Sequence, residues 1–203
     1  MSAFLGPIHY WLYNKIEFQD NLVENVISYS ESFGQGEGIR SELSKKYSEL
    51  EKQPLEEIID ETNIHGWLQE KVSIVEYRLA DVVSGILARD AGRFEDLEKI
   101  FFEYGKEYSA AGKDSAVMIY RFVTDNLLDG MPCDRANQLV TEDDELAVWV
   151  RNTCVHKAYW DTANGDISIY YSLRDALIKG MLYGSGFEYE RTDENTNQIK
   201  RGV

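Results

Sequence analysis

Cysteine and proline are scarce in this sequence. The 203 residues include two cysteines, Cys133 and Cys154, which are too few for the disulfide framework of a small secreted protein. The N-terminal residues have neither the basic region nor the apolar stretch of a signal peptide. We therefore expect both cysteines to be free thiols and the protein to be cytoplasmic. The three prolines, at positions 7, 54 and 132, coincide with expected helix starts and ends.

Positive charge is also in short supply. The chain has 21 Lys and Arg residues against 36 Asp and Glu residues, a formal charge of −15. Because no basic cluster offsets this balance, neither nucleic acid nor an anionic membrane is an expected partner. No apolar run approaches the roughly 18 residues of a membrane span. The 43% hydrophobic and 12% aromatic content are those of a folded globular protein.

Histidine occurs three times, and two of the three lie in an internal repeat. Residues 8–16 (IHYWLYNKI) align without a gap with residues 64–72 (IHGWLQEKV), with five identities in nine positions. The residues that follow keep their chemical type in the same register. We interpret the match as an ancient duplication. It places His9 and His65 at equivalent positions near the starts of two similar helices.

The paired histidines have two interpretations. Neutral imidazoles from two helices could bind a transition metal or the iron of a haem. Alternatively, the repeated Ile-His-x-Trp-Leu segment is a packing solution, in which each histidine donates to a backbone carbonyl and each tryptophan fills the core. No second ligand follows at the spacing of zinc enzymes or di-iron proteins. The sequence leaves open whether the two helices run parallel or antiparallel, and an antiparallel pair would hold His9 and His65 apart.

Residues 1–130 are expected to form a helical bundle, with the repeat copies near 8–28 and 64–84. Gly6 and Pro7 are typical of a helix start, and Asn63 can cap the second copy. Hydrophobic periodicity predicts further helices over residues 39–52, 54–60, 92–108 and 114–128.

Residues 131–203 are expected to form a smaller α+β unit, so that the whole chain is mainly helical α+β. Residues 146–150 are β-branched and aromatic, and 187–190 alternate apolar with acidic residues; both patterns predict strands. Residues 167–171 fit a strand or a helix start. Residues 172–175 resemble a capping box before a helix. The residues after 193 would form a final strand or a frayed tail.

Two polar segments are interpreted as connections. The glycines at 34, 36 and 38 have the spacing of a phosphate loop, but they follow a helix and lack its lysine. The acidic residues 142–145 lack the glycine and alternating spacing of a calcium loop, so we expect an exposed turn.

Cys154 and His156 form the most specific catalytic hypothesis. If the strand from residue 146 continues, both side chains point to the same face. The imidazole could then activate the thiol as a nucleophile, while Arg151 holds an anionic substrate. The alternatives are a soft-metal site and a buried, inert thiol.

Aromatic residues are dense near the repeat. Tyr10 and Trp11 in the first copy, and Trp67 in the second, combine apolar rings with polar tips. Such residues are frequent in half-wet cavities and subunit interfaces. We therefore expect Tyr10, Trp11 and Trp67 to contact a small-molecule ligand, and we expect a homodimer.

The C-terminal third resembles a known group of domains. A strand followed by Asn152-Thr153-Cys154, a helix and Gly186-Phe187-Glu188-Tyr189-Glu190-Arg191-Thr192 is similar to the closing section of L-2-amino-thiazoline-4-carboxylic acid hydrolase-like proteins and of 4-vinyl reductase domains. The resemblance implies an α+β unit that handles a small molecule, with Cys154 matching the first cysteine of the pattern. The later cysteines of that pattern are absent here.

These observations predict a small-molecule-binding protein, with hydrolysis at Cys154 as its most specific activity. A non-catalytic metal or haem protein that uses His9 and His65 is the alternative. An interaction protein without any such site is a third.

Overall fold

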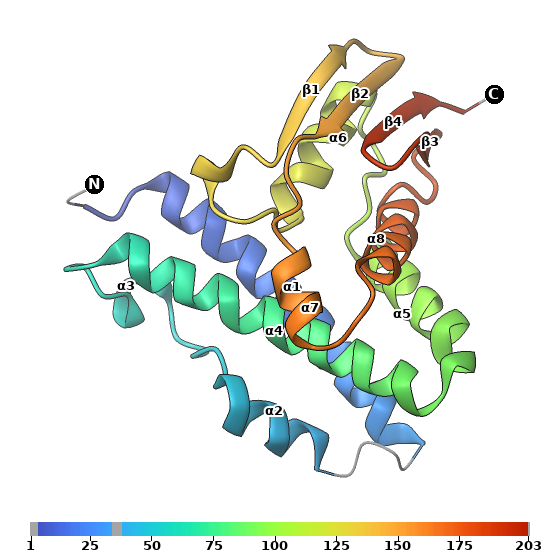
Figure 1. The fold of residues 1–203 in the computed structure, drawn as a ribbon. Helices are drawn as coiled ribbons and strands as arrows, with labels where there is room; N and C mark the ends of the chain where they lie inside the picture. Colours follow the sequence, from blue (N-terminus) through green and yellow to red (C-terminus); the bar gives the residue numbers. More distant parts are fainter. Residues whose placement is uncertain (1–3, 34–37, 203) are drawn as a thin grey trace.

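A computed structural model describes residues 4–33 and 38–202 and confirms the mainly helical α+β class (Figure 1). The first part of the chain is helical: α1 (Pro7–Ser32), α2 (Ile39–Tyr47), α3 (Leu55–Ile58), α4 (Ile64–Arg89), the 3₁₀ helix η1 (Ala91–Arg93), α5 (Phe94–Glu107) and α6 (Ala116–Asn126). A second 3₁₀ helix, η2 (Pro132–Asp134), leads into the remaining elements: β1 (Asn137–Glu142), β2 (Leu146–Arg151), α7 (Lys157–Thr162), α8 (Ile167–Met181), β3 (Phe187–Arg191) and β4 (Thr196–Arg201). Most of the predicted connector at 34–38 lies outside the described residues.

The repeat helices begin where the sequence predicts. Gly6 is the N-cap of α1, and Pro7 is its first residue. The side chain of Asn63 caps α4 by accepting a hydrogen bond from the backbone N–H of Gly66 at 3.2 Å. Both helices are long enough to carry the whole of the predicted repeat.

The strands form one antiparallel sheet in the order β1-β2-β4-β3. The acidic residues 143–145 form the β1–β2 turn, in which Asp143 accepts hydrogen bonds from the backbone of Glu145 and Leu146. The exposed turn expected there is confirmed. The edge strand β1 was not predicted; its burial alternates between half-buried and exposed residues, and a register shift lies between Leu139 and Thr141.

Two expectations for residues 146–182 are wrong, and of the two alternatives for residues 167–171 the helix start is confirmed. The strand from Leu146 ends at Arg151, and His156 is instead the N-cap residue of α7, with a helical backbone. The segment 167–171 is helical, because Asp166 caps α8 by accepting from the backbone N–H of Ser168 at 2.8 Å. Ser172 therefore lies inside α8 rather than at a capping box.

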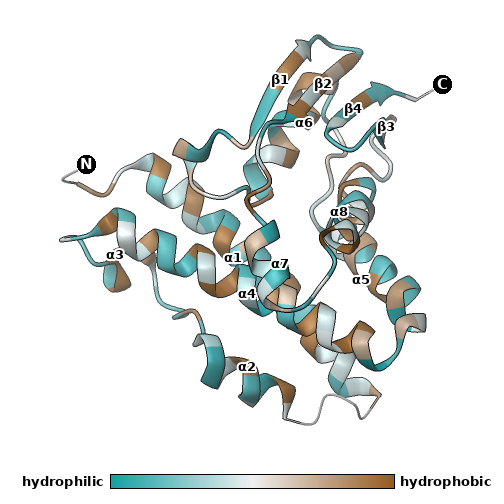
Figure 2. Ribbon diagram, in the orientation of Figure 1, coloured by the Kyte–Doolittle hydropathy of each residue, from teal (hydrophilic) through white to brown (hydrophobic). Residues whose placement is uncertain are grey.

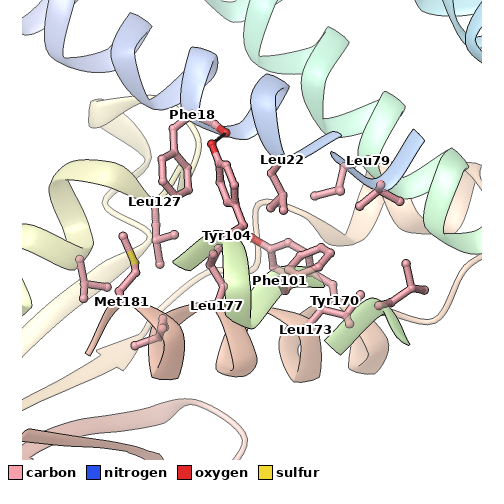
Figure 3. Packing of buried hydrophobic residues seen from close by; sticks show 14 of the residues in the cluster. Phe18, Leu22, Leu79, Phe101, Tyr104, Leu127, Tyr170, Leu173, Leu177 and Met181 are labelled. Atoms are coloured by element: carbon pink, nitrogen blue, oxygen red, sulfur yellow. Dashed lines mark hydrogen bonds between the residues drawn. The ribbon is translucent and has the colours of Figure 1, made fainter. Parts of the chain in front are cut away.

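Helices α5 and α8 are in close contact through glycine. A Cβ atom at Gly105 would collide with the backbone oxygen of Leu177, and one at Gly180 with that of Phe102. This approach brings the side chains of α8 into one cluster with those of α1, α4 and α5, as Figure 3 shows. In that view the Tyr104 hydroxyl donates to the backbone oxygen of Phe18 at 2.8 Å, which ties α5 to α1.

The expected boundary near residue 130 falls between α6 and β1, and side chains from both sides of it share this core. The colouring in Figure 2 shows hydrophobic and hydrophilic residues interleaved along the long helices, as amphipathic helices require. Within residues 4–33 and 38–202, no helix is long and apolar enough to cross a membrane.

Candidate functional site

Helices α1 and α4 pack side by side and run parallel (Figure 1). The rings of Tyr13 and Trp67, both near helix starts, are 5.7 Å apart between centroids. Farther along, Arg78 donates to Asp20 at 2.6 Å. Since early residues meet early residues and later meet later, the two copies of the repeat lie in parallel, with both histidines at one end of the pair.

The two copies also share a local contact that the alignment did not reveal. The ammonium of Lys15 lies 3.8 Å from the centroid of the Trp11 ring, and that of Lys71 lies 4.8 Å from the centroid of Trp67. Both lysines are buried. A cation held on an aromatic face is stabilised by the charge distribution of the ring. The equivalent tryptophans thus perform equivalent structural roles in α1 and α4.

A cleft opens at the common N-terminal end of these helices, and we call it the histidine cleft. Its volume is about 250 Å³. His9 and His65, the repeated pair, both line it, and Cys133 of η2 joins them. The apolar part of the lining consists of Ile8, Leu12, Ile64, Leu68, Met131 and Pro132, and the remaining polar residues are Glu61, Thr62 and Asn63.

The two imidazoles differ in their surroundings. Nδ1 of His9, which is half-buried, accepts a hydrogen bond from the backbone N–H of Gly6 at 2.9 Å. That bond requires an unprotonated Nδ1, so in the neutral ring the proton is on Nε2. His65 is exposed at the edge of the cleft. Both histidines therefore lie at the cleft, and neither is fully buried in the core.

The lining of the cleft does not amount to a metal centre. Across the part of the chain that the structure describes, no group of three or more His, Cys, Asp or Glu side chains could hold a metal ion. The cleft is also below the roughly 300–1,000 Å³ typical of drug-sized ligands, and a haem is larger than such ligands commonly are. The residues thus give the metal and haem hypotheses little support.

A second feature is a largely buried cluster of ionisable groups that we call the ionic cluster: Glu76, Asp129, His156, Tyr170 and Arg174. Nδ1 of His156 lies 3.1 Å from both carboxylate oxygens of Glu76. Its Nε2 lies 3.0 Å from the Tyr170 hydroxyl and 3.5 Å from Asp129. Arg174 completes the cluster by donating to Asp129 at 2.8 Å and to Tyr170 at 3.1 Å.

The charges of this cluster determine the protonation of His156. Burial alone would lower the pKa of the imidazole, but the carboxylates of Glu76 and Asp129 outweigh it and raise the pKa to about 9. Burial likewise opposes ionisation of Asp129, yet Arg174 and His156 hold its pKa below the ordinary value. His156 is therefore an imidazolium at neutral pH. Both of its ring nitrogens carry protons, and neither can accept one.

Cys154 lies outside this cluster. Its sulfur accepts a hydrogen bond from the Tyr171 hydroxyl at 3.1 Å, and among the described residues no hydrogen bond joins it to His156. Arg151 stacks on the same Tyr171 ring at 3.7 Å and donates to Asn195 at 2.6 Å. The geometry does not pair the thiol with an available base.

The predicted aromatic ligand contacts have other partners. The Tyr10 hydroxyl donates to Glu56 at 3.4 Å, and the indole N–H of Trp11 donates to Asp125 at 2.9 Å. Trp67 packs on Tyr13. These three side chains belong to α1 and α4, the helices that form the histidine cleft, but they are not part of its lining.

A second cavity, of about 260 Å³, is lined by Glu76, Asp134, Tyr159 and their neighbours. Its acidic groups are already engaged, since Glu76 bonds to His156 and Asp134 accepts from the backbone N–H of Met131 at 2.8 Å. Of these two cavities, the histidine cleft is the better candidate for a ligand.

Comparison with known proteins adds nothing to this geometry. No family model, curated protein or solved structure matches the chain. The resemblance of the C-terminal third to the hydrolase-like and reductase-like domains stays a prediction.

Sequence reasoning identified the histidines of the cleft but missed the ionic cluster. Asp20 and Glu76 recur at equivalent positions of the repeat, each on the buried face of its helix, and this recurrence was the one usable signal. Asp129 precedes Gly130 in a segment that is typical of a helix end, and Arg174 lies in a helix of mixed composition. Nothing local marks either residue as buried.

Proposed function

We propose that this chain is a cytoplasmic small-molecule-binding protein whose ligand occupies the histidine cleft. The observation that carries the proposal is the convergence of both copies of the repeat on one cleft. His9 and His65 come from equivalent positions of parallel helices and face it together. A concave site with an apolar lining and a few polar groups is the usual form of a small-molecule site.

The lining has an apolar part and a polar part, which suit the apolar and polar parts of a ligand. Leu12, Leu68 and Met131 are almost fully buried and form an apolar floor. Ile8, also in the lining, is 54% exposed, so a ligand would remove an apolar side chain from water. The imidazoles supply the polar contacts that fix orientation.

Hydrolysis at Cys154 is not part of the proposal. A general base must be able to accept the proton of its nucleophile. His156 is protonated and bonded on both nitrogens, and Cys154 contacts Tyr171 instead. A homodimer stays a prediction. Among the described residues, the large exposed apolar side chains are spread along the chain and do not belong to one element: Phe4 before α1, Ile8 and Tyr10 of α1, Met118, Val140 and Tyr183.

The three histidines make the proposal directly testable. Imidazole C–H signals of His9, His65 and His156 can be assigned by substitution and followed by NMR during titration with a library of small organic fragments. We expect binding fragments to shift the signals of His9 and His65 and to leave that of His156 unchanged. Fragments that bind while moving only His156, or no histidine, would contradict the proposal.

A pair of variants locates the binding. Cys133→Trp places a large side chain in the histidine cleft, whereas Asn14→Trp places the same side chain on the exposed face of α1. We expect C133W to abolish fragment binding and N14W to retain it. Elemental analysis of the untagged protein decides the alternative: a stoichiometric metal that is lost in H9A/H65A would replace this proposal with the metal-binding one.

A further inference from the structure

We infer that the ligand of the histidine cleft is a small amphipathic carboxylate, with its acid group between His9 and His65 and its apolar chain on the floor of the cleft. This inference rests on the proposed function and adds the chemical class of the ligand.

The polar group that the cleft presents most clearly to a ligand is a donor. The bond from Gly6 to Nδ1 of His9 leaves Nε2–H as the group free to donate. The side-chain oxygen of Asn63 already accepts from the backbone N–H of Gly66. The Thr62 hydroxyl donates its proton to Asp60 at 2.6 Å, so Thr62 and Glu61 are the acceptors of the lining.

The helices add to this bias. The first N–H groups of a helix have no partner within it, and the N-terminal end carries a partial positive charge. Since α1 and α4 are parallel, two such ends lie at one cleft, and Ile8, Ile64 and His65 all belong to its lining. An oxyanion satisfies both the imidazole donors and these backbone donors.

One group opposes an anion, and it provides a further test. Glu61 lines the cleft but is exposed, so its repulsion is reduced by solvent. The apolar floor of Leu12, Leu68 and Met131 excludes a fully polar anion such as inorganic phosphate as the best ligand, because it would leave that surface unfilled. The ligand must combine an acid with a short apolar chain.

The test compares three probes with alkyl chains of similar length and different head groups: hexanoate, hexan-1-ol and hexylamine. Each is titrated into the full chain by calorimetry, with the imidazole signals followed by NMR. We expect hexanoate to bind about tenfold more tightly than hexan-1-ol, because charge-assisted hydrogen bonds are stronger than neutral ones. Hexylamine should bind most weakly.

Variants assign the effect to particular groups. His65→Gln changes an exposed residue and should leave the fold intact while reducing the preference for hexanoate over hexan-1-ol. Glu61→Gln should strengthen hexanoate binding by roughly twofold, and Glu57→Gln, an exposed acid outside the cleft, should not.

The outcomes separate the two proposals. Equal or tighter binding of hexan-1-ol or hexylamine, with His9 and His65 still shifting, would overturn the carboxylate inference and leave the binding site in place. Failure of all three probes to move His9 or His65 would also overturn it. The fragment library then decides whether the cleft binds ligands of any other class.

Discussion

Asp20 and Glu76 occupy equivalent positions in the two copies of the repeat, and each is a buried carboxylate with a buried cationic partner. Asp20 bonds to Arg78, and Glu76 bonds to His156. Removal of one member of such a pair leaves the other charge buried and uncompensated. We therefore expect the loss of either buried partner to destabilise the fold more than the loss of an exposed ion pair does.

Arginine variants test this difference between buried and exposed pairs. Both Arg78 and Arg40 bind Glu24, but Arg78 is buried whereas the Arg40 side chain is 40% exposed. We expect Arg78→Ala to lower the free energy of unfolding by about 3–5 kcal/mol, and Arg40→Ala by about 1 kcal/mol or less. Urea unfolding followed by circular dichroism measures both. Equal losses would mean that burial is not what distinguishes the two pairs.

His156 should give the protein a characteristic dependence on pH. Its pKa of about 9 in the folded chain exceeds the value of 6.5 for an unperturbed imidazole. The stabilisation is therefore complete below pH 6.5 and is lost as pH rises through 9. We expect the free energy of unfolding to fall by about 1–2 kcal/mol between pH 6.5 and 8.

The titration of Lys15 sets the upper limit of the pH range over which this prediction holds. Burial lowers the pKa of this lysine from 10.5 to about 8, so above pH 8 its titration increases stability and opposes the effect of His156. Unfolding experiments on the wild type and on His156→Gln isolate the histidine, because the variant should lack the slope. A flat wild-type profile over the same range would show that the imidazole is not charged in the folded state.

At the scale of elements, helices α5 and α8 depend on two glycines at their contact. Replacement of Gly105 or Gly180 by Ala would drive Cβ into the backbone of the facing helix. We expect each substitution to lower the free energy of unfolding by about 1–3 kcal/mol or more. Gly85 of α4 is a matched control, since a Cβ there meets nothing within 4 Å. Gly85→Ala should raise stability by roughly 0.5–1 kcal/mol through its higher helix propensity.

The elements differ in how well sequence predicted them. Helix starts with their own chemical signals, such as Gly6-Pro7 and Asn63, were located correctly because capping is local. The edge strand β1 and the short α7 were missed, since their conformation depends on contacts with β2 and α4. The parallel arrangement of α1 and α4 is likewise set by pairs such as Asp20 and Arg78, which no local pattern announces.

At the scale of the whole molecule, the helical part and the α+β part share one core. Phe101 and Tyr104 of α5 belong to the same cluster as Leu173, Leu177 and Met181 of α8. The expected division into two units stays a prediction, and a fragment tests it. The common core implies that residues 1–130 alone would expose a large apolar face and could not fix their packing.

We expect this fragment to retain helical far-ultraviolet circular dichroism while losing near-ultraviolet signal and dispersion of its amide NMR resonances. The full chain should unfold in a single cooperative transition in urea. A fragment that unfolds cooperatively by itself would establish the two-unit organisation instead.

The cationic partners of Asp20 and Glu76 lie at different positions along the chain, and this affects the order in which structure can form during synthesis. Asp20 finds its cation within the other copy of the repeat, at Arg78, whereas Glu76 requires His156. On the ribosome, α1 and α4 can pair as soon as residue 89 has emerged, but the carboxylate of Glu76 then lacks its counterion. Glu76 lines the second cavity together with Val155 and Tyr159 and bonds to His156, so its counterion emerges with the segment that packs around it.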